Sequence, residues 1–85
     1  MEKMFAIVVL DRGFVYVGTL EKSNGSYKLT EAKNIRRWGT NKGLGQLVLH
    51  GPQDNTMLDK CGTVLFNEKA LISIHPTDQE LWAKK

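Results

Sequence analysis

The sequence is poor in cysteine, in proline and in long apolar runs. Its 85 residues include one cysteine and two prolines. The single thiol, Cys61, cannot form a disulfide within the chain, so the fold does not depend on an oxidising compartment and we expect a cytoplasmic protein. The longest apolar run, MFAIVVL at residues 4–10, is far too short to span a bilayer and ends at the charged pair Asp11-Arg12. It therefore predicts a strand rather than a membrane or secretory segment.

The sequence also lacks residues with the spacing of a catalytic or metal site. His50, Cys61 and His75 could supply metal ligands, but no two of them have zinc-ligand spacing. Neither a Walker loop nor a dinucleotide-binding fingerprint occurs, and the acidic residues are scattered over predicted loops. We therefore expect a binding protein rather than an enzyme, with no metal and no cofactor.

The composition is that of one small globular domain. Hydrophobic residues make up 41% and charged residues 25% of the sequence, which is ordinary for globular proteins. A chain of this length buries only about 60–65% of the surface that its unfolded form exposes, so it has room for a single core. We expect one domain over residues 1–85, with a small margin of stability.

Short runs of β-forming residues predict a mainly β fold. Residues 4–10 and 14–20 flank the turn sequence Asp11-Arg12-Gly13, which predicts a hairpin. Asn24-Gly25, a common tight-turn pair, leads into YKLTEAK at residues 27–33, where apolar and polar residues alternate. The first three strands therefore form a meander.

Two later runs predict a second hairpin. GTVLF at residues 62–66 and ALISI at residues 70–74 are joined by Asn67-Glu68-Lys69. Several short strands with closely spaced turns are typical of a small barrel or roll. Because the strands carry apolar residues on both faces and the chain is small, we expect a second copy to complete the core in a homo-oligomer, at least a dimer.

Residues 43–52 are compatible with a strand or a helix. Leu44, Leu47 and Val48 have helical spacing, and Gly51-Pro52 is a common helix stop, so a short central helix is favoured.

The C-terminal residues predict a helical turn. Thr77 and Glu80 have the spacing of a capping box, and lysines end the chain. We expect this turn to pack Leu81 or Trp82 onto the barrel.

The positive charges are concentrated in one place. The formal net charge is +3, and four of the 12 Lys and Arg residues lie between residues 32 and 42, where no acidic residue occurs: Lys33, Arg36, Arg37 and Lys42. Concentrated positive charge attracts partners that carry phosphate. A solvated face that binds nothing gives the same pattern.

The segment NIRRWGTNKGLGQL, residues 34–47, adds an aromatic ring and glycines to these charges. On a strand, Arg36 and Trp38 share one face, where a guanidinium could grip phosphate oxygens while the indole stacks on a base. If residues 44–50 form a helix, the loop of residues 39–43 leads into its N-terminus, where free backbone N–H groups and the helix dipole favour an anion. The candidate ligand-binding residues are Arg36, Arg37, Trp38, Gly39, Thr40 and Lys42. In the alternative interpretation, Trp38 belongs to a core or an interface and the glycines serve turns.

Several short motifs resemble those of a family of small uncharacterised proteins of bacteriophages and bacteria. These motifs are VYVG at 15–18, IRRWG at 35–39, GLGQL at 43–47, GP at 51–52 and TMLD at 56–59. The resemblance covers roughly residues 12–76 and implies a phage or mobile-element setting, with no established activity. A second, shorter similarity relates GTLEKSNGSYKLTEA and NEKALISIHP to strands of Sm-like barrels.

The resulting expectation is a small SH3-like or Sm-like barrel or roll with a short central helix and a short C-terminal helical turn. We expect it to be a phage-encoded binding module that captures a phosphate-bearing ligand in the host cytoplasm. That ligand is a nucleotide signal of host defence, which the module would sequester, or a short nucleic acid. The alternative is an interaction module that docks on a host protein through the same surface.

Overall fold

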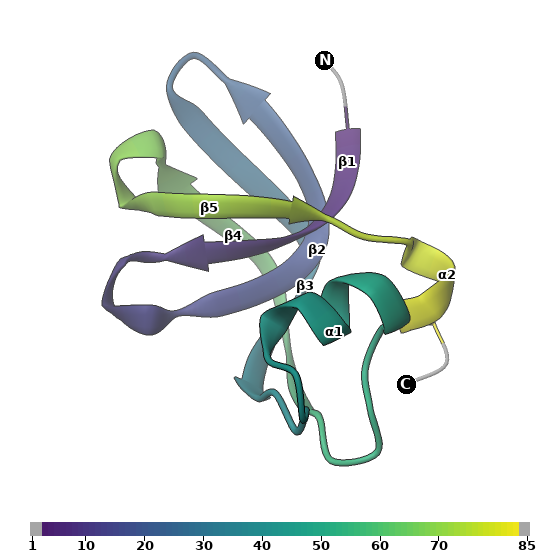
Figure 1. Ribbon diagram of the computed structural model, residues 1–85. Helices are drawn as coiled ribbons and strands as arrows, with labels where there is room; N and C mark the ends of the chain where they lie inside the picture. Colours follow the sequence, from purple (N-terminus) through teal and green to yellow (C-terminus); the bar gives the residue numbers. More distant parts are fainter. Residues whose placement is uncertain (1–2, 84–85) are drawn as a thin grey trace.

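The computed structural model describes residues 3–83, which form one five-stranded antiparallel sheet and two short helices (Figure 1). The elements are β1 (Lys3–Leu10), the 3₁₀ turn η1 (Asp11–Gly13), β2 (Val15–Ser23), β3 (Ser26–Arg37), α1 (Leu44–His50), β4 (Met57–Asn67), the 3₁₀ turn η2 (Glu68–Ala70), β5 (Leu71–Pro76) and α2 (Gln79–Trp82). The strand order across the sheet is β4-β3-β2-β1-β5. The predictions of a mainly β fold, a central helix and a C-terminal helical turn are confirmed.

Two tight turns produce the predicted meander. Arg12 and Gly13 adopt positive φ values of 62° and 80° in η1, and Asn24 and Gly25 adopt 43° and 81° between β2 and β3. Asn-Gly is the preferred pair for a hairpin turn in which both central residues have positive φ. β1 pairs with β2 and β2 pairs with β3, both antiparallel, so this prediction is confirmed.

The predicted hairpin between residues 62–66 and 70–74 is wrong. β4 pairs with β3 and β5 pairs with β1, so that these two consecutive strands form opposite edges of the sheet. Only the three residues of η2 separate them, so the chain from Asn67 to Leu71 reaches at most about 14 Å. The edges of a flat five-stranded sheet would lie about 19 Å apart. The sheet is therefore strongly curled (Figure 1). No ladder joins β4 to β5 within residues 3–83, so the sheet is not a closed barrel.

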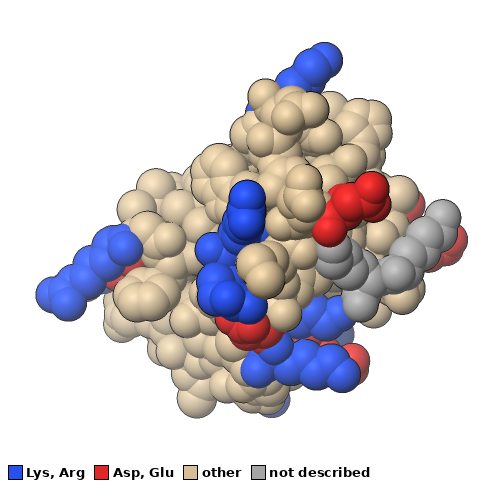
Figure 2. Space-filling model, turned by 90° about the horizontal axis from the view of Figure 1, so that it is seen from below, with Lys and Arg blue, Asp and Glu red and all other residues tan. Residues whose placement is uncertain are grey.

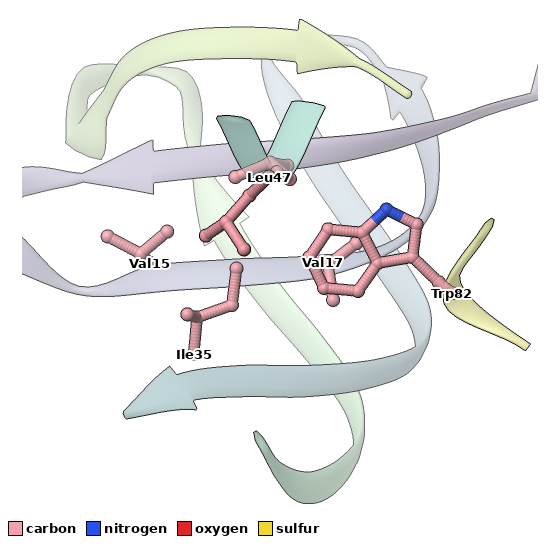
Figure 3. Close-up of a cluster of buried hydrophobic side chains, with 6 residues drawn as sticks. Val15, Val17, Ile35, Leu47 and Trp82 are labelled. Carbon is pink, nitrogen blue, oxygen red and sulfur yellow. The ribbon is translucent and has the colours of Figure 1, made fainter. Parts of the chain in front are cut away.

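The two helices cover one face of the sheet. Leu47 of α1 and Trp82 of α2 pack with Val15 and Val17 of β2 and Ile35 of β3, as Figure 3 shows. Leu47 is fully buried and Trp82 is 2% exposed. The predicted packing of Trp82 onto the sheet is therefore confirmed.

The other face forms a second core inside the curl. Its buried residues come from the three central strands: Val8, Leu10, Leu20, Leu29 and Ala32. Val64 and Phe66 of β4 and Leu71 and Ile74 of β5 pack against them. Each face of the sheet thus has a core of its own within one chain, although Leu65 of β4 and Ile72 of β5 stay exposed. The homo-oligomer stays a prediction.

The favoured helix over residues 44–50 is confirmed, and Gly51 ends it. Gly51 adopts a φ of 76°, and its N–H donates to the carbonyl of Leu47 at 2.9 Å. A side chain here would also collide with α2, because a Cβ atom would lie 2.8 Å from the Cβ of Leu81. Among residues 3–83, no helix has the length and apolar character needed to cross a membrane.

The predicted capping box at the C-terminal turn is wrong. Asp78, rather than Thr77, caps α2, and its side chain accepts a hydrogen bond from the N–H of Glu80 at 3.0 Å. The hydroxyl of Thr77 instead donates to the carbonyl of Val48 in α1 at 2.7 Å and accepts from Nε1 of Trp82 at 3.2 Å. Thr77 therefore ties the two helices together, which its spacing from Glu80 could not reveal.

Candidate ligand-binding site

The two candidate arginines lie at a β-bulge where β3 ends. Ile35 pairs with Leu58 of β4, and Arg37 pairs with the next residue back along β4, Met57. Two steps along β3 thus match one step along β4, and Arg36 is the extra residue. An extra residue of this kind bends the strand and interrupts the alternation of its side chains.

Arg36 and Arg37 line the same open hollow, whose volume is about 530 Å³. The rest of its lining comes from the loop before β4 and from the start of β4: Asp54, Asn55, Thr56, Met57 and Leu58. We call this feature the arginine hollow. The sequence placed Arg36 beside Trp38 and Arg37 on the opposite face, but the bulge brings the two arginines to one hollow instead.

The two arginines differ in their partners. Nε of Arg36 donates to Oδ2 of Asp59 at 2.9 Å, and the exposed fractions of these side chains are 56% and 48%. Arg37 forms no ion pair with any residue between 3 and 83. The Arg36–Asp59 bond occupies one nitrogen, and the terminal nitrogens of the guanidinium carry further N–H donors.

Acidic side chains lie close to the basic segment in space. Asp59 pairs with Arg36, and Asp54 contributes to the lining of the arginine hollow. Figure 2 views the molecule from below the orientation of Figure 1 and shows Lys and Arg in separate groups, some with Asp or Glu directly beside them. On this face the Lys and Arg side chains do not form one continuous basic patch. The arginine hollow is a site of mixed charge.

Trp38 lies just outside β3 and is 39% exposed. Its carbonyl accepts a hydrogen bond from the hydroxyl of Thr56 at 2.6 Å. Its ring lies beside Gly43, where an added Cβ would be 4.0 Å from Cζ3 of the indole. Trp38 is therefore not part of the buried core, and it is not among the residues that line the arginine hollow.

The predicted anion site at the start of α1 stays a prediction, and the loop that leads into α1 is already hydrogen-bonded. Oε1 of Gln46 accepts hydrogen bonds from the backbone N–H groups of Asn41, at 3.0 Å, and Lys42, at 2.9 Å. These groups belong to the loop before α1, and the side chain of Gln46 already satisfies them. The side chain of Lys42 is exposed and Thr40 is half-buried, and neither lines the arginine hollow.

Gly39 lies close against the loop residues that line the arginine hollow. It adopts a φ of 62°, and a Cβ atom on it would lie 2.2 Å from the backbone carbon of Asn55. The adjacent Thr56 is 2% exposed, and its hydroxyl accepts from the N–H of Gln53 at 2.8 Å while it donates to Trp38. These contacts hold residues 53–56, and with them one wall of the hollow, against the end of β3.

Sequence reasoning missed most of that wall. Asn55 and Thr56 were not candidates, and Asp54 and Asp59 were considered only as acids scattered over loops. The one available signal is the TMLD motif at 56–59, which contains Thr56 and Asp59. Nothing in its spacing shows that it lies opposite IRRWG.

Groups suited to catalysis are sparse in the part of the chain that the structure describes. There, no cluster of three or more His, Cys, Asp or Glu residues could hold a metal ion. The hydroxyl of Ser73 and Nε2 of His75 are hydrogen-bonded at 2.9 Å on β5. Within residues 3–83, no third side chain bonds to this imidazole to orient it as a catalytic base.

The fold and the site together define a small, mainly β domain with a mixed-charge hollow at the end of β3. Comparison with protein-family models, with curated protein sequences and with solved structures found no match to this chain. The function of the site is therefore argued from its own geometry and chemistry.

Proposed function

We propose that this chain is a non-catalytic binding module that captures a phosphate-bearing ligand in the arginine hollow. The observation that carries the proposal is that Arg36 and Arg37 line one hollow while only Arg36 has an ion-pair partner among the described residues. Guanidinium groups suit phosphate because their N–H groups can bind two oxygens at once.

The other candidate residues have supporting roles in this proposal. Trp38, Thr40 and Lys42 belong to the loop that follows the arginines, where they would contact parts of a ligand that extend beyond the hollow. Gly39 lets this loop pack against residues 53–56, as its close approach to Asn55 requires.

The setting that we propose comes from the resemblance to bacteriophage and bacterial proteins. A phage-encoded module in the host cytoplasm would lower the free concentration of a nucleotide signal of host defence, or would hold a short nucleic acid. We also propose that the curled sheet is an open variant of the SH3-like or Sm-like barrels. Its curl and the 3₁₀ turn between its two edge strands support that assignment.

The test compares two charge reversals on the same strand. Arg37→Glu removes the arginine that has no ion-pair partner among residues 3–83, whereas Lys28→Glu makes the same charge change at an exposed position nine residues away, about 30 Å along β3. Calorimetric titration with pyrophosphate, AMP and a short oligonucleotide should show at least a tenfold loss of affinity in Arg37→Glu and little change in Lys28→Glu. If Arg37→Glu binds each of the three probes as tightly as the wild type does, the proposal is wrong.

The purified protein provides an independent test. Material released on heating should contain a nucleotide or oligonucleotide by mass spectrometry, and Arg37→Glu should release less of it. If the wild type binds none of the three probes and releases no such material, the proposal is wrong.

The second candidate function is docking on a host protein through the same surface. Trp38 is 39% exposed and Met57 is 41% exposed, next to two arginines. Trp, Met and Arg are enriched at protein interfaces. A host protein that co-purifies with the wild type but not with Arg37→Glu, in the absence of released nucleotide, would favour this function.

A further inference from the structure

Another pocket lies between α2 and the sheet. Its apolar wall is formed by Phe5 of β1, Val17 of β2 and Trp82 of α2, and Figure 3 shows the indole of Trp82 beside Val17. Because Trp82 is 2% exposed, this wall is continuous with the helix-covered core. The volume of the pocket is about 200 Å³, compared with about 530 Å³ for the arginine hollow, and the two share no lining residue. We call this feature the α2 pocket.

Two side chains of opposite charge line the α2 pocket from β3. Glu31 is exposed and Lys33 is half-buried. They do not pair with each other, and neither forms an ion pair or a side-chain hydrogen bond with any residue between 3 and 83. A half-buried ammonium group loses part of its hydration, so an anion bound beside it replaces interactions that water no longer provides. The pocket thus combines an apolar wall with one unpaired acid and one unpaired base.

Glu31 occupies a strained position at a β-bulge. Thr30 pairs with Thr19 of β2. Lys33 pairs with Val17, so three steps along β3 match two steps along β2. Glu31 adopts a φ of 50°, which glycine tolerates and a residue with a Cβ atom adopts only at a cost in free energy. Backbone strain of this kind is concentrated at functional sites.

The neighbouring strand accommodates this bulge through a glycine. A Cβ atom added to Gly18 of β2 would lie 2.9 Å from the carbonyl oxygen of Thr30 and 3.2 Å from Cα of Ala32. Glycine at this position therefore lets β3 lie closely over β2. Leu29 and Ala32, three residues apart, both belong to the core inside the curl, and between them the bulge leaves Glu31 at the α2 pocket.

We propose that the α2 pocket binds a small zwitterion with an apolar side chain, which is the chemistry of a free apolar amino acid. The ammonium group of the ligand lies against Glu31, its carboxylate against Lys33 and its side chain against the apolar wall. The amide of Gln79, which also lines the pocket, can donate to the same carboxylate. This inference goes beyond the proposed function and does not depend on it, because no group of the arginine hollow takes part.

Other classes of ligand fit the α2 pocket less well. Among the described residues, Lys33 is the only cationic side chain in its lining, and Glu31 repels a phosphate that carries no positive group. An uncharged apolar molecule would leave both charged groups without partners. Only a ligand with both charges provides a partner for each of them.

The test uses five probes on the full chain: leucine, phenylalanine, N-acetyl-leucine, leucinamide and glycine. The last three lack the ammonium charge, the carboxylate and the apolar side chain, respectively. Calorimetric titration of the wild type at neutral pH should show that leucine or phenylalanine binds at least tenfold more tightly than any of these three.

Two variants each remove one charge of the pocket. Glu31→Gln should weaken leucine binding at least fivefold and leave N-acetyl-leucine binding unchanged. Lys33→Met should weaken leucine binding at least fivefold and leave leucinamide binding unchanged. The controls Glu68→Gln and Lys28→Met make the same substitutions at exposed positions outside the pocket and should change none of the affinities.

Glu31→Gly keeps the test decisive if Glu31→Gln unfolds. Glycine adopts a positive φ without strain, so the thermal midpoint should not fall, whereas leucine binding should weaken as in Glu31→Gln. NMR spectra locate the site, because the indole N–H signal of Trp82 should shift when leucine is added and that of Trp38 should not.

Several outcomes would overturn the inference. The wild type could bind neither leucine nor phenylalanine, or it could bind N-acetyl-leucine or leucinamide as tightly as leucine. A Glu31→Gly protein with the leucine affinity of the wild type, or a leucine response confined to the signal of Trp38, would overturn it as well. All of these outcomes leave phosphate capture intact, since that function is tested separately with Arg37→Glu.

Discussion

Arg36 of β3 and Asp59 of β4 form a diagonal ion pair across neighbouring strands. Asp59 lies opposite Asn34 in the ladder, and its Oδ2 accepts from Nε of Arg36, two residues further along β3, at 2.9 Å. The pair holds one guanidinium beside the arginine hollow and neutralises part of its charge. Exposed pairs of this kind contribute about 0–1 kcal/mol to stability, so its main effect is on what the arginine can bind.

Asp59→Asn is expected to raise the affinity for pyrophosphate and nucleotides by about two- to fivefold. The substitution removes a negative charge near the binding groups, and such a charge is worth roughly 1 kcal/mol at a few ångströms in a well-solvated site. The thermal midpoint should change by only a few degrees. A loss of affinity in calorimetric titration would instead mean that Asp59 is needed to hold Arg36 in its binding position.

Gly39→Ala is expected to destabilise the fold more than Gly13→Ala. Both glycines have positive φ, 62° and 80°, but only Gly39 packs against backbone, with Asn55 2.2 Å from an added Cβ. Gly13 has no atom within 4 Å of that position, so alanine there adds only the conformational cost of about 1–2 kcal/mol. Chemical denaturation should give Gly39→Ala at least about twice that loss, together with weaker ligand binding. Equal losses of stability in the two variants would show that residues 53–56 shift at little energetic cost to make room for the added methyl group.

The two tryptophans should respond differently to truncation. Trp82 is 2% exposed in the helix-covered core and Trp38 is 39% exposed. Trp82→Ala should cost about 3–5 kcal/mol of the free energy of unfolding, and Trp38→Ala less than about 2 kcal/mol. Thermal melts are a sufficient measurement, because about 1 kcal/mol shifts the midpoint of a domain this small by 4–8 °C.

The variant Trp82→Phe complements these melts by isolating the fluorescence of Trp38. The emission should be that of a partly exposed indole and should change when AMP binds nearby. A buried spectrum that ignores nucleotides, with a large loss of stability in Trp38→Ala, would place Trp38 in the core.

The open edges of the sheet bear on the predicted homo-oligomer. β4 and β5 each leave one side unpaired within the described residues, and they carry Leu65, 72% exposed, and Ile72, 65% exposed. Open edges are places where another strand can pair. We expect light scattering at micromolar concentration to give at least a dimer, and Leu65→Asp to shift it toward monomer. A monomeric wild type at physiological salt would contradict this prediction.

Local features of the fold could be predicted because neighbouring residues encode them. The apolar runs, the turn at Asn24-Gly25 and the stop at Gly51 gave the meander and α1, since strand periodicity and positive φ depend on a few adjacent residues. The local argument failed where two elements compete for one side chain. Thr77 has the spacing of a cap, yet its hydroxyl donates to the carbonyl of Val48 in α1, 29 residues away in sequence.

The sequence by itself determined which segments become strands and helices, and that cationic side chains gather before residue 43. Tertiary structure decided the strand order, the curl that brings the edge strands β4 and β5 within reach of η2, and the bulge that brings Arg36 and Arg37 to one hollow. It also decided the charge of that hollow, because Asp59 lies 23 residues from Arg36 along the chain and only strand pairing brings them together. Register between distant strands depends on the packing of both faces at once, and no local pattern in the sequence contains that information.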